Sequence, residues 1–180
     1  MMGNSEKDGK TPYIIHPLSM ACYAVALGIK EDSVIATILL HDICEDCNVS
    51  LQSLPFSHDV REGVKCMTFK MNDDENKIQA KQKYFSGLLN SREALVCKGL
   101  DRYDNLSDMV GEFDANRIAK NLVETDLLLL PVLKEGKEKW PDLSNIIFVI
   151  RNNIKNLVAA LKFYNQTEYD KWYGIYQTER

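Results

Sequence analysis

The chain has 180 residues, of which 45% are hydrophobic and 27% charged, and its formal net charge is −4. This length and composition are typical of one globular domain, so we expect residues 1–180 to form a single unit. The acidic balance argues against general nucleic-acid binding, which needs a basic surface. No apolar run approaches the roughly 20 residues that span a bilayer, and the polar start does not resemble a signal peptide. The five scattered cysteines favour a reducing cytoplasm over a disulfide framework.

Helical periodicity dominates the first quarter of the chain. Residues 16–26 carry apolar side chains at helical spacing, and Gly28 is suited to end that helix. Asp32 or Ser33 can cap a second helix, which we expect to continue without interruption through residues 35–46.

The rest of the chain also favours helices. Residues 48–53 are predicted to form a turn, residues 71–76 an acidic loop, and residues 136–141 a break. Further helices are predicted over residues 60–67, 77–89, 91–109, 116–133 and 143–164. We therefore expect an all-α fold, a compact bundle of about seven or eight helices.

The segment HDICED, residues 41–46, is the most informative polar cluster. On a helix, His41 and Glu45 lie on one face, as do Asp42 and Asp46. The preceding segment is apolar, and burying three carboxylates beside it without a partner is costly. A divalent cation is the natural partner. Alternatively, the acidic residues near this helix end face solvent.

Two further clusters contain residues able to bind a metal. His16 lies within PYIIHP, residues 12–17, and Asp101 lies within KGLDRYDN, residues 98–105. Taken alone, His16 is more commonly a packing histidine, and Asp101 more commonly forms a local ion pair with Arg102.

Together and in this order, the three clusters resemble the HD-domain pattern of the RelA/SpoT-type alarmone hydrolases. The family motifs read approximately G-x-P-Y-x-x-H-P, L-H-D-x-x-E-D and K-x-A-D-R-x-x-N. The match covers about residues 9–110, with a weaker echo near Glu124. Because the synthetase half is missing, the small hydrolase-only members are the closer comparison. The resemblance implies one HD-type phosphohydrolase domain.

By this resemblance, one divalent metal ion is bound by His16, His41, Asp42 and Asp101. Two imidazoles and two carboxylates suit Mn²⁺, Fe²⁺ or Zn²⁺. Family precedent favours Mn²⁺, and Mg²⁺ is a further alternative.

The resemblance also implies roles in catalysis and substrate binding. Glu45 and Asp46 are expected to orient and deprotonate the attacking water as general bases. Asn105 is expected to contact the nucleoside, and we group Tyr13 with it as a substrate-binding residue.

The chain departs from the family in the segment before the Pro-Tyr motif. The family has a helix there, with an arginine that stacks on guanine, whereas this chain has only about ten residues and no arginine before Arg61. Lys7 and Lys10 are the nearby cations and are expected to bind the substrate, but a lysine does not replace a stacked guanidinium. Asp104 stands where the family commonly has histidine and adds negative charge.

The remaining polar residues receive structural interpretations. Arg102 is expected to support the site through an ion pair, and Lys98 is grouped with it. Cys44 and Cys47 form a C-x-x-C pair without a second such pair, so we interpret them as buried structural thiols. His58 is expected at the surface.

The leading hypothesis is cytoplasmic hydrolysis of a nucleotide phosphate, namely the 3′-pyrophosphate of guanosine tetraphosphate (ppGpp). The missing arginine leaves a phosphatase of another nucleotide, such as NADPH, as an alternative. A non-catalytic nucleotide-binding regulatory module is the other alternative, although Glu45 and Asp46 argue against it. We expect no nucleic-acid or membrane partner, and the oligomeric state stays open.

Overall fold

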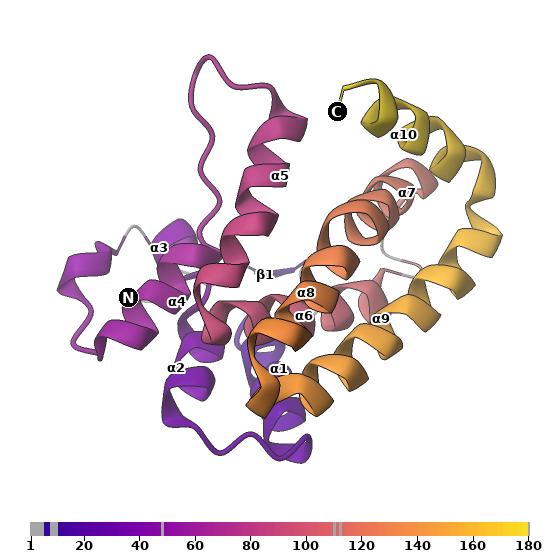
Figure 1. The fold of residues 1–180 in the computed structure, drawn as a ribbon. Coiled ribbons are helices and arrows are strands. Elements are labelled where there is room, and N and C mark those ends of the chain that lie inside the picture. Colours follow the sequence, from indigo (N-terminus) through magenta and orange to yellow (C-terminus); the bar gives the residue numbers. More distant parts are fainter. Residues whose placement is uncertain (1–5, 8–10, 48, 110, 112, 180) are drawn as a thin grey trace.

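The computed structural model describes residues 6–7, 11–47, 49–109, 111 and 113–179, and helices form most of that part of the chain (Figure 1). The α-helices are α1 (Ile15–Ala26), α2 (Asp32–Leu40), α3 (Ile43–Asp46), α4 (His58–Met67), α5 (Lys77–Gly87), α6 (Arg92–Asp108), α7 (Ala115–Glu124), α8 (Leu130–Lys139), α9 (Ser144–Tyr164) and α10 (Gln166–Thr178). Short 3₁₀ helices span Leu51–Ser53, Leu88–Asn90 and Pro141–Leu143. The strands β1 (Glu6–Lys7) and β2 (Thr11–Pro12) pair antiparallel, with Glu6 opposite Pro12.

The expected all-α class is confirmed. A π-helical segment, Thr125–Leu129, joins α7 directly to α8, so these three elements form one continuous rod. Since α3 has only four residues, the described part of the chain corresponds to the expected bundle of about seven or eight substantial helices.

Helix α6 lies in the middle of the bundle and contacts α1, α2, α4 and α9 (Figure 1). Its apolar side chains are completely enclosed, as Leu95 and Leu106 illustrate with 0% exposure. The main apolar cluster contains side chains from all the described α-helices except α3, and a smaller cluster forms around Val60 and Val64 on α4. The buried polar residues of α6, among them Asp101, are therefore held by packing on several sides.

Local capping signals explain why several helix ends match the sequence prediction. The Ser91 hydroxyl accepts a hydrogen bond from the Ala94 amide at 3.1 Å and begins α6. The Asn76 side chain accepts from the Ile78 amide at 2.7 Å and begins α5. Gly28 follows α1 with φ +90°, a left-handed conformation that glycine adopts without strain.

The second helix differs from its prediction at its start. Glu31, rather than Asp32 or Ser33, is the N-cap residue of α2, and it makes no side-chain cap hydrogen bond. The Ser33 hydroxyl instead donates to Glu93 on α6 at 3.2 Å. A tertiary contact has replaced the local cap.

The uninterrupted helix expected over residues 35–46 is also wrong. Helix α2 ends at Leu40, and α3 begins only at Ile43. Between them, Asp42 adopts φ −99° and ψ 0°, and the His41 ring bonds back to the Ile38 carbonyl. This interruption changes the direction of the acidic residues that follow.

At the C-terminal end, the break predicted at residues 136–141 begins later, because α8 continues to Lys139. A Cβ atom at Gly136 would overlap Leu95 Cδ2, so this glycine allows α8 to approach α6 closely. Helix α10 was not predicted; it follows α9 after Asn165 and packs on α7 (Figure 1).

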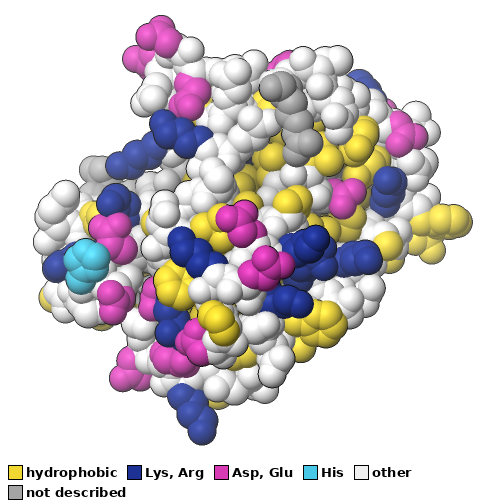
Figure 2. Space-filling view, in the orientation of Figure 1, with side chains coloured by type: hydrophobic (Ala, Val, Ile, Leu, Met, Phe, Trp, Pro, Cys, Tyr) yellow, Lys and Arg dark blue, Asp and Glu magenta, His cyan; other side chains and the backbone are white. Residues whose placement is uncertain are grey.

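The described helices include none long and apolar enough to cross a membrane. On the face drawn in Figure 2, basic and acidic side chains are interspersed rather than separated into large patches of one sign.

Candidate metal centre

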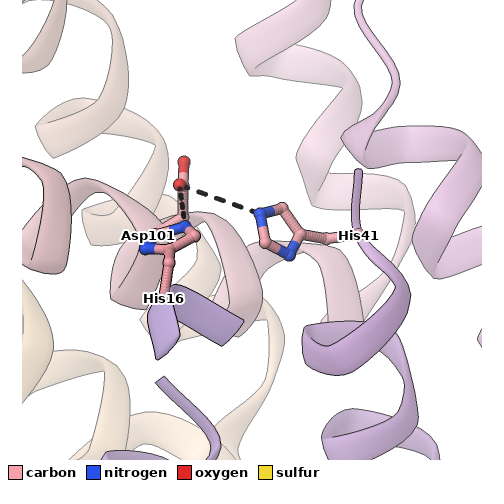
Figure 3. A group of neighbouring side chains, drawn as sticks. All are labelled: His16, His41 and Asp101. Carbon is pink, nitrogen blue, oxygen red and sulfur yellow. Dashed lines mark ion pairs between the residues drawn. The ribbon is translucent and has the colours of Figure 1, made fainter. Parts of the chain in front are cut away.

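Three side chains from different helical segments converge in the interior (Figure 3). His16 lies in the first turn of α1, His41 directly follows α2, and Asp101 lies on α6. Their potential ligand atoms lie within 4.8 Å of one another, and all three residues are buried. His16 Nε2 is 3.3 Å from Asp101 Oδ1, and His41 Nε2 is 4.0 Å from the same oxygen. The geometry is that of a possible metal site.

The hydrogen bonding of His41 tests whether the cluster is suited to a metal ion. Its Nδ1 is 2.8 Å from the Ile38 carbonyl oxygen, which can only accept, so the Nδ1–H group donates there. Its Nε2 is buried and makes no hydrogen bond within the described structure. Asp42 Oδ2 lies 3.0 Å from that nitrogen, and with the proton on Nδ1 both facing atoms are acceptors. An inward-facing imidazole nitrogen without a hydrogen bond fits a divalent metal ion.

Asp101 is the best-anchored carboxylate of the site. Lys98 Nζ lies 2.8 Å from Asp101 Oδ2, and the Asn105 amide donates to Oδ1 at 2.6 Å. Burial alone would raise the pKa of Asp101, but Lys98 and the two histidines hold it well below its usual value. Asp101 is therefore an ionised, oriented potential ligand.

Asp42 lies beside the cluster but outside the group of three. Its Oδ2 accepts a hydrogen bond from the Tyr13 hydroxyl at 2.5 Å and is 3.0 Å from His41 Nε2. Burial alone would raise the pKa of Asp42, yet His41 and Tyr13 lower it. Tyr13, expected to bind substrate, thus directs its hydroxyl at a predicted metal ligand.

Glu45 and Asp46 are both exposed on α3, so the buried acidic stripe expected from an unbroken helix does not form. The Phe69 amide donates to the Glu45 carboxylate at 2.6 Å, which orients it toward the segment after α4. Burial and the nearby Asp42 carboxylate raise the pKa of Asp46. Asp46 is therefore electrostatically coupled to the site.

Arg102 and Lys98 differ in their contacts. Lys98 pairs with Asp101, whereas the buried Arg102 donates to the Asn121 side chain at 2.8 Å, on α7. Lys10 lies outside the described residues, and so does the side chain of Lys7.

The remaining structural interpretations have mixed outcomes. Cys44 is partly buried, but Cys47 is exposed, so the expectation of a buried thiol pair is wrong. His58 is exposed as expected.

One contact of the site was not predicted. Asp104 Oδ2 lies 2.5 Å from His16 Nδ1, on the opposite side of the imidazole from the nitrogen that faces Asp101. The available signal was spacing, because Asp104 follows Asp101 by three residues on the same helix. The identity of its partner on α1 could not be read from that spacing.

The fold and the cluster together define an all-helical protein with a buried His-Asp site of the kind that can bind a divalent metal. No protein-family model matches the chain. It is 30% identical over 129 residues to a guanosine-3′,5′-bis(diphosphate) 3′-pyrophosphohydrolase of Aquifex aeolicus, a match that covers 68% of this chain and 18% of the relative. It is 35% identical over 106 residues to the 3′-pyrophosphohydrolase MESH1 of Xenopus tropicalis, covering 56% of this chain and 57% of the relative.

The expected resemblance to HD-type ppGpp hydrolases is thus confirmed, at modest identity. The chain spans less than two thirds of the length of either relative.

Proposed function

We propose that this chain is a metal-dependent phosphohydrolase that removes the 3′-pyrophosphate of guanosine tetraphosphate, with residues 1–180 acting as one domain. The observation that carries the proposal is the buried convergence of His16, His41 and Asp101, in which His41 Nε2 has no hydrogen bond. The names of the two relatives supply the reaction and the substrate.

The charges around the cluster support a divalent ion. Four carboxylates gather near the two histidines: Asp42, Asp46, Asp101 and Asp104. Lys98 supplies one positive charge. Asp101 is buried, Asp42 and Asp104 are partly buried, and Asp46 is exposed. Holding these carboxylates close together beside a single lysine is unfavourable, so an ion of charge +2 would stabilise the arrangement. We assign His16, His41 and Asp101 as ligands, with Asp42 as the fourth, and Mn²⁺ as the ion.

The chain's own residues prepare the site. The Ile38 carbonyl holds His41 with Nε2 inward, and Lys98 holds Asp101. Tyr13 holds Asp42 beside them. When bound, a divalent ion lowers the pKa of a coordinated water and offsets negative charge on a phosphoryl group.

Proton removal from the attacking water is assigned to Asp46 together with Glu45. A general base works best when its pKa lies near the working pH, and burial and Asp42 shift the pKa of Asp46 upward. Glu45 lies in the same turn, fixed by the Phe69 amide, and we assign it to orienting the water.

Substrate binding is assigned to Asn105 and Tyr13 at the site and to Lys7 and Lys10 from the N-terminal segment. Asn105 and Tyr13 already hydrogen-bond Asp101 and Asp42, so each links a proposed ligand to the nucleotide.

Product analysis tests the proposed reaction. Wild-type protein with Mn²⁺ should convert guanosine tetraphosphate into guanosine diphosphate and pyrophosphate in equal amounts. Asp101→Asn should abolish this turnover, whereas Asp108→Asn, with the same charge change at an exposed position on α6, should preserve it. Release of single phosphates, or equal activity of Asp101→Asn, would contradict the assignment.

A further inference from the structure

Resting on the proposed metal centre, we propose that Asp104 is a positioning residue that fixes the tautomer and orientation of His16. The carboxylate contacts the far side of the His16 imidazole, with Asp104 Oδ2 at 2.5 Å from Nδ1. Nothing in the sequence pattern of the metal ligands requires a carboxylate here.

The contact determines which ring nitrogen faces the metal centre. An ionised carboxylate is only a hydrogen-bond acceptor, so His16 Nδ1 carries a proton directed at Asp104. The other nitrogen, Nε2, then faces Asp101 Oδ1 at 3.3 Å. A metal ion needs the lone pair of that nitrogen, and the Nδ1–H tautomer provides it.

His41 provides a comparison within the same site. Its Nδ1 donates to the Ile38 carbonyl, a neutral acceptor, and its Nε2 faces inward. Both histidines therefore direct Nε2 toward Asp101, but the partner of Nδ1 is a carboxylate at His16 and a backbone carbonyl at His41. A carboxylate acceptor makes the imidazole a more basic ligand than a neutral carbonyl does.

Asp104 contacts His16 from α6, and its own side chain is partly exposed, at 25%. A hollow of about 130 Å³ lies beside Asp104, with Met20, Tyr23 and Leu100 among its lining residues. The carboxylate of Asp104 is thus directed at the imidazole of His16.

Three variants test the inference. Asp104→Leu removes the acceptor, Asp104→Asn keeps a neutral acceptor of nearly the same shape, and Asp108→Asn is the matched control on an exposed turn of α6. The Mn²⁺ dissociation constant is measured by competition with a chromogenic chelator. The His16 tautomer is measured by ¹⁵N NMR in chelator-treated protein.

We expect Asp104→Leu to weaken Mn²⁺ binding by roughly 10–100-fold, Asp104→Asn by less, and Asp108→Asn not at all. The Nδ1–H tautomer of His16 should persist in Asp104→Asn and be lost in Asp104→Leu. If His41→Ala abolishes Mn²⁺ binding but Asp104→Leu changes neither the Mn²⁺ affinity nor the His16 tautomer, the role of Asp104 is overturned and the metal centre stands. Mn²⁺ binding that His41→Ala leaves intact would overturn the metal centre itself.

Discussion

Replacing Lys98 by methionine should destabilise the protein much more than the same change at Lys65. Both lysines pair with a carboxylate three residues away on a helix, at 2.8 Å for Lys98–Asp101 and 2.9 Å for Lys65–Glu62. The pairs differ in burial, since the side chains of the first are 16% and 9% exposed and those of the second 56% and 37%. Methionine keeps the length of the lysine stem, so the comparison isolates the charge.

Lys98→Met leaves the Asp101 carboxylate buried beside other acidic groups, and breaking a buried pair in this way costs about 3–5 kcal/mol. With a urea slope of about 2 kcal/mol per M, the unfolding midpoint should fall by roughly 1.5–2.5 M. Lys65→Met should leave the urea unfolding midpoint unchanged within error, because solvent already screens that pair. Both are measured with a chelator present, since a bound metal ion would supply positive charge to Asp101.

The destabilisation caused by Lys98→Met should depend on pH. The pKa of Asp101 is held below its usual value in the folded protein, so its stabilising contribution is present above the unfolded pKa of about 3.9 and is lost as the pH falls through the folded pKa. The difference between the wild type and Lys98→Met should therefore be full at neutral pH and shrink in acid. Equal midpoint shifts for the two lysine variants would refute the reasoning.

Three other predictions concern catalysis, packing and base choice. Glu45→Gln should keep Mn²⁺ and the fold but slow turnover by roughly 10²–10⁴-fold; an unchanged single-turnover rate would exclude its role with the water. Gly136→Ala should lower the free energy of unfolding by about 1–3 kcal/mol, because its Cβ would overlap Leu95. Gly174→Ala should raise it slightly, because that glycine lies in open space within α10. Thermal unfolding of both variants measures the difference. In the family that the chain resembles, an arginine before the Pro-Tyr motif stacks on the base, and residues 1–60 of this chain contain no arginine. A cation–π contact is worth roughly 0.5–2 kcal/mol, so we expect comparable kcat/KM for guanine and adenine substrates, and a strong guanine preference would contradict this.

Local signals predicted much of the fold. The predicted helix over residues 91–109 corresponds to α6, because Ser91 is a strong N-cap and the apolar spacing is helical. Local sequence signals gave wrong predictions where tertiary contacts determine the backbone conformation. Gly136 was interpreted as a helix break, but it serves the close packing of α8 on Leu95, and this neighbour lies 41 residues earlier in the sequence.

The candidate site was predictable to a similar extent. The family motifs singled out His16, His41 and Asp101, which the structure brings together across three helical segments. The interruption after Leu40 could not be predicted from apolar spacing, since it depends on the His41 ring bonding the Ile38 carbonyl. It places the acidic residues of α3 on the exposed surface beside the cluster.

Calorimetric titration of chelator-treated protein with Mn²⁺, for the wild type and His41→Ala, tests the central claim most directly. His41 Nε2 is buried without a hydrogen bond, and its assignment as a metal ligand rests on that observation. Removing His41 therefore tests the metal centre directly. The wild type should bind one ion per chain, and His41→Ala should lose that binding while remaining folded. A wild type that binds no ion, or a variant that binds it with the same affinity, would contradict the account.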